Sequence, residues 1–419
     1  MGSQWRVEFA EELNSWVVRQ RWYAGKSHEP RFRILESQQV TGATRYLLMD
    51  DAGSLPALYQ VPLALVGSAP SEDAVVHRGD EGFVIDAAKD ATFTTGLLAE
   101  MGVDTSRITG SRVFTGEQSN TSIVFDEDGQ PTIILKLFRT LHHGENPDVT
   151  VQRALSNAGS PYVPRFYGNL DVEWPDIGRE SGVAHGTLGF AQEFLPGAQD
   201  GWAVALEEAR HGRDFTDAAR DLGTAIAGVH GALGAALETV EAKPSDVTAT
   251  GIAWRRRLRI AAAEVPAVAE RLGEIEAVYA AALARPWPRL QRIHGDLHLG
   301  QVLAVPQGGW RIVDFEGEPL RPMNERAIPD LPPRDVAGML RSFDYASAVG
   351  GGPNASEWAA ACRKAFIDSY ASSAGSVVLD PVLLRALVLD KAVYESIYEA
   401  RNRPAWLPVP LAGIDAALS

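Results

Sequence analysis

The sequence has a single cysteine, Cys362, so it cannot form an internal disulfide. We expect this residue to be a small buried side chain rather than a nucleophile. No apolar run approaches the roughly 18 residues of a membrane-spanning helix, so no transmembrane segment is expected. The first ten residues contain Arg6 and Glu8 and lack the apolar centre of a signal peptide. These absences together predict a cytoplasmic protein.

Basic residues are also scarce. Lys and Arg number 39 against 54 Asp and Glu, which gives a net charge of −15. Nucleic acids and anionic membranes attract basic patches, so neither is expected as a partner. What is present is ample apolar material, at 45% of 419 residues, enough for a sizeable core and for two or three domains.

The most informative segment runs from Ile293 to Gln301 (IHGDLHLGQ) and is followed by Ile312–Glu316 (IVDFE). It resembles the kinase catalytic loop H-R-D-x-x-x-x-N and the later D-F-G. Asp296 and Gln301 lie five positions apart, as the Asp and Asn of that motif do, and Asp314 takes the place of the D-F-G aspartate. Gln in place of Asn, and Glu in place of Gly, resemble kinases of small molecules.

The chemistry of phosphoryl transfer accounts for this spacing. A kinase has to aim a hydroxyl at the γ-phosphate of ATP and neutralise charge between the phosphates. Asp296 would accept a hydrogen bond from the hydroxyl, and Gln301 and Asp314 would offer oxygens to Mg²⁺. Two short apolar strands, 301–305 and 310–314, flank a turn at 306–309. The resulting hairpin is predicted to bring Asp314 beside Gln301.

Two other interpretations of the same segment stay open. His294 and His298 lie four apart, as in a helical zinc site, although Gly295 is a poor helix residue and the H-E-x-x-H base is absent. The segment could also be an Asp-capped turn before a hairpin, which the downstream Asp-Phe-Glu makes less favoured. Otherwise the two histidines are expected to pack the loop.

Upstream, residues 133–138 form an apolar strand interrupted by Lys136. A charge in such a strand is usually paired, and Lys136 resembles the kinase lysine that contacts ATP phosphates. The alternative is the solvated face of an edge strand. A strand–turn–strand at 112–125 offers Ser119 and Asn120 as donors over the phosphates, or is an ordinary hairpin turn.

A helix is predicted to begin at Pro147, with Asn146 as its N-cap. Its Asp148 is the acid available to hold Lys136. A later strand is predicted to run into the hinge that binds adenine, through the backbone of Gln192, Glu193 and Phe194.

From about residue 196 the chain is predicted to be mainly helical. The helix 381–403 has one apolar face. Its charged residues are typical of a solvated face: Lys391, Glu395, Glu399 and Arg403. Near the N-terminus, the G-K-S at 25–27 is not a P-loop, because Gln20 stands where the motif needs a glycine.

Three further segments carry a family resemblance over essentially the whole chain: Arg21–Lys26 (RWYAGK), Arg334–Tyr345 (RDVAGMLRSFDY) and Tyr394–Pro404 (YESIYEARNRP). Together with residues 293–301, called the catalytic segment from here on, they resemble the actinobacterial maltokinase family. The resemblance implies an α+β, protein-kinase-like bilobal fold. It implies a cap subdomain over 1–95, a small lobe with an antiparallel sheet over 96–195, and a helical large lobe over 196–419.

The same resemblance implies ATP- and Mg²⁺-dependent conversion of maltose to maltose 1-phosphate for α-glucan synthesis, with trehalose synthase as a partner. Asp296 would be the base, Gln301 and Asp314 the metal ligands, and Lys136 a phosphate contact. Residues of the sugar site would be Tyr394, Glu399, Arg403, Trp406 and His298. Each of these could instead hold the lobe together. Arg334, Asp335 and Asp344 are expected to support the loop behind the catalytic hairpin.

Two other functions remain. One is a kinase for another sugar, for glucosamine or for an aminoglycoside. An aminoglycoside site should be strongly acidic, whereas arginines interleave Glu395 and Glu399. The other is a non-catalytic pseudokinase, which is disfavoured because the expected base, metal ligands and lysine are all present.

Overall fold

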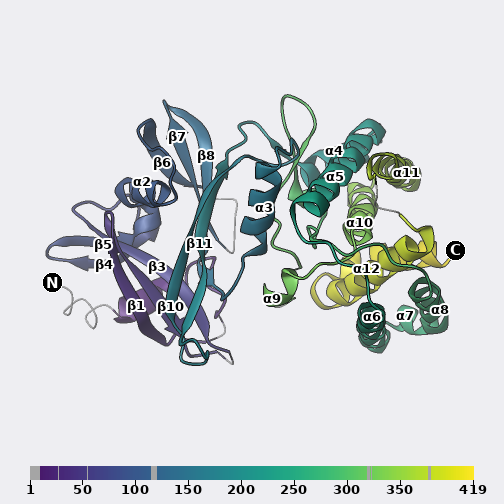
Figure 1. The fold of residues 1–419 in the computed structure, drawn as a ribbon, viewed down its shortest axis with the longest axis horizontal. Helices are drawn as coiled ribbons and strands as arrows, with labels where there is room; N and C mark the ends of the chain where they lie inside the picture. The colour runs from purple at the N-terminus through teal and green to yellow at the C-terminus, as the bar shows by residue number, and fades with distance from the viewer. Residues whose placement is uncertain are drawn as a thin grey trace. The chain divides into compact units, whose positions relative to one another are not determined.

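The computed structural model describes residues 10–26, 28–53, 55–114, 120–318, 321, 323–375 and 379–419. The chain divides into two compact units. Unit 1 is Met1–Val149 with Arg165–Pro196, and unit 2 is Thr150–Pro164 with Gly197–Ser419. Antiparallel sheets make up most of unit 1 and helices most of unit 2, so the predicted α+β class is confirmed (Figure 1). The division of unit 1 near residue 95 stays a proposal.

The N-terminal part of unit 1 is an antiparallel sheet with the strand order β1-β2-β3-β5-β4. A helix precedes the sheet and another follows it. The elements are α1 (Ala10–Val17), β1 (Phe32–Val40), β2 (Ala43–Asp50), β3 (Ala57–Val66), β4 (Val75–Gly79), β5 (Gly82–Asp86) and α2 (Ala91–Glu100), with short 3-10 turns at Glu72–Ala74 and Ala87–Lys89.

A second antiparallel sheet in unit 1 has the order β10-β11-β8-β7-β6. Its strands are β6 (Ile108–Phe114), β7 (Thr121–Glu127), β8 (Gln130–Leu137), β10 (Phe166–Pro175) and β11 (Val183–Glu193). In β8 alternate residues face the core, because side chains of a strand point to opposite faces. Ile133, Leu135 and Leu137 are buried, and Lys136 lies on the other face.

Side chains and backbone join the two sheets of unit 1. Strand β3 pairs with β9 (Thr140–Leu141), which follows β8 directly. Gln60 of β3 donates both amide hydrogens, to Phe138 O and Leu188 O at 2.5 Å each. The fully buried Arg139 donates to Asp86 at 2.6 Å and lies 5.0 Å from the ring of Trp22. The segment Arg21–Lys26, singled out in the sequence, therefore contributes core residues.

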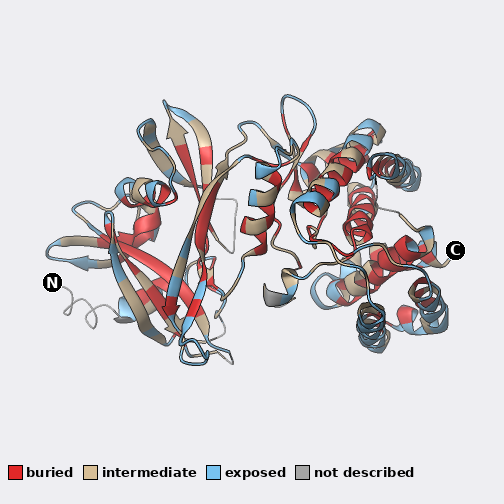
Figure 2. Cartoon of the chain, viewed as in Figure 1, coloured by how far each residue is buried: buried red, intermediate tan, exposed pale blue. Residues whose placement is uncertain are grey.

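Unit 2 is built around three helices that carry many of its buried side chains, α5, α10 and α12, as Figure 2 shows. Its elements are β12 (Gln199–Asp200), α4 (Gly201–His211), α5 (Thr216–Ala236), α6 (Pro244–Glu264), α7 (Pro266–Glu270), α8 (Leu272–Leu283), η4 (Leu299–Gln301), β13 (Val302–Ala304), β14 (Trp310–Ile312), α9 (Met323–Arg326), α10 (Pro333–Gly350), α11 (Ala355–Ser373), α12 (Pro381–Asn402), η5 (Pro404–Trp406) and α13 (Pro408–Leu418). The helix α3 (Pro147–Asn157) crosses the boundary between the units.

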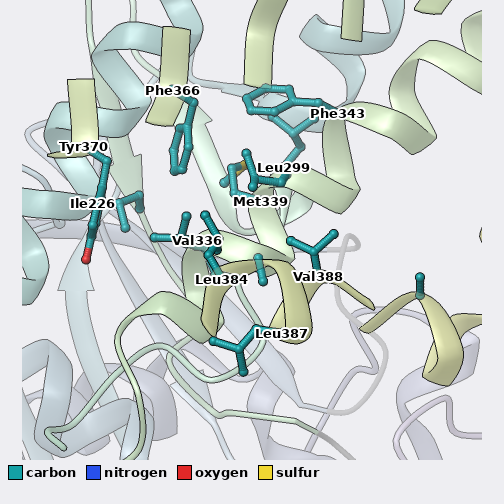
Figure 3. Close-up of a cluster of buried hydrophobic side chains, with 14 of the residues drawn as sticks. Ile226, Leu299, Val336, Met339, Phe343, Phe366, Tyr370, Leu384, Leu387 and Val388 are labelled. Atoms are coloured by element: carbon teal, nitrogen blue, oxygen red, sulfur yellow. The ribbon is translucent and has the colours of Figure 1, made fainter. Parts of the chain in front are cut away.

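The core of unit 2 lies directly under the catalytic segment. Leu299, which begins η4, is fully buried among Met339 and Phe343 of α10 and Val388 of α12 (Figure 3). Burying one such side chain contributes about 1.5–3 kcal/mol, so this contact anchors the loop strongly. Within the described residues, no helix is long and apolar enough to span a membrane.

Candidate active site

The catalytic segment runs into a short hairpin, as predicted. Strand β13 pairs with β14 in the register Val302↔Ile312, and Val313 N donates to Gln301 O at 3.0 Å. The backbones of Gln301 and the residue before Asp314 are therefore in contact. Asp314 itself has a φ of +68°, a left-handed conformation that costs a non-glycine residue energy. Such strain is often found at functional sites.

Hard oxygen ligands gather at the end of this hairpin. The carboxylate oxygens of Asp314 and Glu316 lie within 4.8 Å of each other. Two carboxylates and the amide oxygen of Gln301 are the ligand types that Mg²⁺ prefers, so the residues present fit a divalent cation. Glu316 was noted in the sequence only as a departure from D-F-G, and its nearness to Asp314 adds a third candidate ligand.

Asp335, near the N-terminus of α10, holds the loop that precedes Asp296. It accepts hydrogen bonds from His294 N at 2.8 Å, from Gly295 N at 2.9 Å and from His230 Nε2 at 3.0 Å. Burial raises the pKa of Asp335, but the hydrogen bond from His230 and the other donors outweigh it, so the net pKa lies below the usual value. The expected role of Asp335 in supporting the loop agrees with these contacts.

The two histidines of the segment make loop contacts of their own. His294 Nε2 lies 3.0 Å from Val313 O, and its Nδ1 accepts from Asp296 N at 3.4 Å. His298 Nδ1 accepts from Gly300 N at 3.0 Å. Burial lowers the pKa of His298. Because both ring nitrogens of His294 already serve the loop, the geometry does not favour zinc.

Asp296 lies at one end of a cleft in unit 2 with a volume of about 580 Å³. Its Oδ1 is 3.3 Å from Nζ of Lys391, on α12. All five residues predicted for the sugar site line this cleft. The cleft is bounded by Asp200, Trp202, Asp296, His298, Gly300, Gly338, Ser342, Tyr345, Lys391, Tyr394, Glu395, Tyr398, Glu399, Arg403 and Trp406.

Glu399 is the buried centre of the sugar-side cluster. Arg403 donates to it from Nε at 3.0 Å and from a terminal nitrogen at 2.7 Å, and Tyr345 donates its hydroxyl at 3.1 Å. The guanidinium of Arg403 in turn lies 4.3 Å from the ring of Trp406, within cation–π range. Glu399 therefore holds the guanidinium of Arg403 in place, and that guanidinium packs against the ring of Trp406, which lines the cleft.

The prediction that the charged face of α12 is solvated was wrong for Lys391, Glu395 and Glu399, whereas Arg403 at its end is exposed. Glu395 is paired with the fully buried Arg341, with contacts of 2.9 and 2.8 Å, and Arg341 also reaches Asp344 at 2.7 Å. Burial raises the pKa of Glu395, and Arg341 offsets only part of that effect. The charged stripe faces other helices and the cleft, because α12 is covered on several sides. An i, i+4 run of mixed charge looks the same in a sequence whether water or protein covers it.

Tyr394 was expected to offer the sugar an aromatic face. The structure places two cations over its ring, Lys391 Nζ at 5.4 Å and Arg257 Cζ at 5.9 Å. The ring of Tyr394 therefore packs against Lys391 and Arg257, and the first of these cations contacts Asp296. Trp202, Tyr345 and Tyr398 line the cleft as well, and sequence reasoning assigned none of them a contact with the sugar.

In unit 1, Lys136 and Asp148 form the predicted ion pair, with 2.9 Å between Nζ and Oδ2. Only 13% of the lysine side chain and 3% of the aspartate side chain are exposed. The edge-strand alternative for Lys136 was wrong, because β8 lies between β7 and β11. Helix α3 begins at Pro147, and Asn146 accepts from Asp148 N at 3.0 Å, as the capping pattern predicted.

The hinge residues differ from the expectation in one respect. Glu193 N donates to Arg165 O and Phe194 N donates to Thr132 O, each at 2.8 Å. These two amides already donate hydrogen bonds within unit 1. An adenine ring would therefore have to accept a hydrogen bond from an amide further along the chain. Gln192 is paired with Ile134 in the sheet. Ser119 lies outside the described residues, and Asn120, directly before β7, is partly buried.

Comparison with known proteins identifies the family of this chain. Residues 111–370 match the phosphotransferase enzyme family (APH). The chain belongs to the phosphotransferase enzyme family. Residues 16–90 of this phosphotransferase match the maltokinase N-terminal cap domain. The predicted combination of cap and kinase-like fold is thereby confirmed, as is a kinase that acts on an alcohol group.

Glucosamine kinases are among the relatives of this phosphotransferase. One from Streptacidiphilus jiangxiensis is 31% identical over 349 residues, which cover 77% of each chain. One from Mycolicibacterium smegmatis is 30% identical over 344 residues, 74% of this chain and 80% of that protein. A solved glucosamine kinase in complex with glucosamine, ADP and inorganic phosphate is 25% identical, with a TM-score of 0.72 over 98% of this chain and 99% of that one.

Proposed function

We propose that this phosphotransferase transfers the γ-phosphoryl group of ATP to a hydroxyl of a small sugar bound in the cleft of unit 2. One observation carries the proposal. Asp296 lies in the same cleft as Glu399, Arg403 and Trp406, the residues expected from sequence to contact a sugar. A hydroxyl-rich ligand suits this lining, because charged and aromatic groups alternate along it. ATP as donor is supported by the ADP in the solved glucosamine kinase complex.

In this proposal each group has a separate task. Asp296 accepts the hydrogen bond of the attacking hydroxyl and orients it. Gln301, Asp314 and Glu316 would hold Mg²⁺, which neutralises charge on the phosphates when it is bound. Lys136, held by Asp148 at 2.9 Å, supplies a fixed positive charge for the nucleotide phosphates. Positioning and charge stabilisation are most of what phosphoryl transfer requires.

Maltose, phosphorylated at the anomeric hydroxyl, is the first candidate acceptor. Three of the four carboxylates lining the cleft are paired with cations: Asp296 with Lys391, Glu395 with Arg341, and Glu399 with Arg403. A cleft balanced in this way suits a neutral sugar, and the maltokinase-type cap points to the same acceptor. The product would be maltose 1-phosphate for α-glucan synthesis, with trehalose synthase as the partner enzyme in the cytoplasm.

Glucosamine is the second candidate, and two observations favour it. The relatives described above are glucosamine kinases. The fourth carboxylate of the cleft, Asp200, is exposed and caps α4 by accepting from Ala203 N at 2.8 Å. An exposed carboxylate at the cleft wall could receive the ammonium group of an amino sugar.

A panel of acceptors tests the proposal and separates the two candidates. Maltose, glucosamine, glucose, trehalose and an aminoglycoside are each supplied with ATP and Mg²⁺. ADP release gives kcat/KM, and phosphorus NMR of the product locates the phosphate. We expect one of the first two sugars to dominate and the aminoglycoside to be inert. If none of the sugars is phosphorylated, the proposed function is wrong.

The variant Asp200→Asn sharpens the choice of acceptor. If glucosamine is the substrate, D200N should raise its KM while leaving the KM for ATP unchanged. If maltose is the substrate, the same variant should have little effect, because a neutral sugar makes no ion pair. Arg403→Lys removes the paired contact with Glu399 and should weaken binding of either sugar.

A further inference from the structure

Lys391 is the charged group in direct contact with the proposed base. It projects from α12, and its Nζ lies 3.3 Å from Asp296 Oδ1. Its side chain is 30% exposed and lines the cleft. Neither the catalytic motif nor the family resemblance drew attention to this residue.

The position of this ammonium is fixed from several directions. Two cations lie over the ring of Tyr394. Lys391 Nζ is 5.4 Å and Arg257 Cζ is 5.9 Å from the ring centroid. Arg257, on α6, is itself paired with Asp390, the residue before Lys391. A lysine held in this way loses little further freedom when a substrate binds, because its rotamer is already selected.

The charges around Lys391 keep it positive. Burial lowers its pKa, but the carboxylates of Asp296, Glu395 and Glu318 outweigh burial, and the net pKa is raised. It therefore remains an ammonium at any pH at which the enzyme works. The titratable and charged groups near the pair come from the catalytic segment, from the loop after β14 and from α6, α10 and α12. They are His294, His298, Asp314, Glu318, Arg257, Arg334, Asp335, Asp390, Tyr394 and Glu395.

We propose that Lys391 is a positioning residue for Asp296. By holding Oδ1, the ammonium turns Oδ2 toward the acceptor hydroxyl. In the transfer, the bond from the acceptor oxygen to γ-phosphorus forms, the bond from that phosphorus to the β-phosphate oxygen breaks with its electron pair going to ADP, and the hydroxyl proton passes to Oδ2. This inference rests on the proposed function, since it needs a hydroxyl acceptor in the cleft.

The size of the effect follows from what phosphoryl transfer requires. The transition state is loose in most analyses, so little proton removal is needed early and the orientation of the hydroxyl matters more. Misplacing a catalytic group by about 1 Å can cost on the order of 100-fold. Loss of the ammonium should therefore act through the orientation of Asp296.

The test compares Lys391→Met with Lys364→Met, a matched control. Lys364 also forms an ion pair on a helix of unit 2, with Asp368, but its side chain is 76% exposed. Steady-state kcat and KM with the best acceptor of the panel are measured, together with the melting temperature of each variant. Lys391→Arg, which keeps the charge, is measured alongside.

For K391M we expect kcat to fall by about 10- to 100-fold while KM for ATP keeps its wild-type value. K391R should keep most of the wild-type kcat, because a guanidinium can still donate to Oδ1 of Asp296. K364M should match the wild type in every respect.

A wild-type kcat in K391M overturns the inference. So does a kcat reduced equally in K391M and K391R, which would indicate a purely structural role. If K391M does not fold, Lys391→Gln takes its place in the same comparison. These outcomes differ from a failure of the proposed function, in which the unaltered chain would phosphorylate no sugar of the panel.

Discussion

The carbonyl oxygen of Leu297 lies so close to Gly338 that a Cβ added there would stand 2.4 Å from it. Leu297 follows Asp296 directly, and Gly338 lies inside α10. The catalytic segment therefore rests on the bare backbone of a buried helix. Together with the hydrogen bonds that Asp335 accepts from His294 N and Gly295 N, this contact fixes the position of Asp296 relative to the core.

A methyl group at position 338 should displace the segment. We expect Gly338→Ala to lower kcat by about 100-fold, since backbone cannot move away as a flexible side chain can. Gly231→Ala is the matched control. Gly231 also lies within a helix, α5, and no described residue lies within 4 Å of a Cβ there. It should retain activity and gain up to about 1 kcal/mol of stability. Equal activity in the two variants would contradict the prediction, because it would show that the contact between Leu297 O and position 338 can accommodate a methyl group.

Asp296→Asn should abolish turnover and leave folding and ATP binding largely intact. The amide keeps the shape of the carboxylate but cannot accept the proton, so we expect a loss on the order of 100-fold or more. Rates of ADP release and calorimetric titration with a non-hydrolysable ATP analogue measure the two effects separately. A variant that kept most of its kcat would remove Asp296 from the role of base.

Activity should require a divalent cation, and Asp314→Asn should lose it. The carboxylates of Asp314 and Glu316 lie within 4.8 Å of each other, and removing one leaves too few charged oxygens to hold Mg²⁺ against the triphosphate. Dialysis against EDTA followed by a Mg²⁺ titration gives the measurement. Full turnover in EDTA would contradict the prediction, and stoichiometric zinc by elemental analysis would revive the site at His294 and His298.

Lys136→Met should raise the KM for ATP or lower kcat, and Asp148→Asn should produce the same defect. Breaking this buried pair leaves one charge without its partner, so each variant should also lose about 3 kcal/mol of unfolding free energy. The control is Asp128→Asn, whose partner Arg107 is 64% exposed, a pair expected to be worth less than about 1 kcal/mol. Normal ATP kinetics in both Lys136→Met and Asp148→Asn would place the nucleotide elsewhere.

Asp335 should make the fold sensitive to acid. Its pKa is depressed in the folded state, so it contributes stability above the unfolded value near 3.9, and that stability is lost as pH falls below this value. Asp335→Asn should cost about 3 kcal/mol at pH 7 and flatten the dependence of stability on pH below about pH 4. Urea unfolding at several pH values measures both. Asp368→Asn, at a 61% exposed carboxylate, should change neither.

The sequence predicted the parts of this site that depend on local pattern. The hairpin after Gln301 and the helix start at Pro147 each follow from residue type and spacing over a few positions, so turn and capping chemistry are enough to place them. The pairing of Lys136 with Asp148 was predicted instead from the resemblance to kinases, because the two residues lie 12 positions apart on different elements.

What the sequence could not supply depends on which elements cover one another. Lys391 and Glu395 looked like surface charges, because only the packing of α12 against α6 and α10 buries them. Tyr394 looked like a sugar platform until two cations were placed over its ring. The amides of Glu193 and Phe194 were expected to be open, but long-range partners at Arg165 and Thr132 occupy them.

The pairing of β3 with β9 has a consequence for building chimaeras of this enzyme. Exchanging residues 16–90 alone with a homologue would replace Gln60, Trp22 and Asp86 while keeping Phe138 and Arg139, which these residues hold. The two residues of each interaction would then come from different parent proteins. These interactions lie directly after β8, the strand that carries Lys136. A recombination joint placed after Leu141 keeps those partners together. The residues that hold the strand after β8 therefore belong, for such an exchange, with the cap segment they contact.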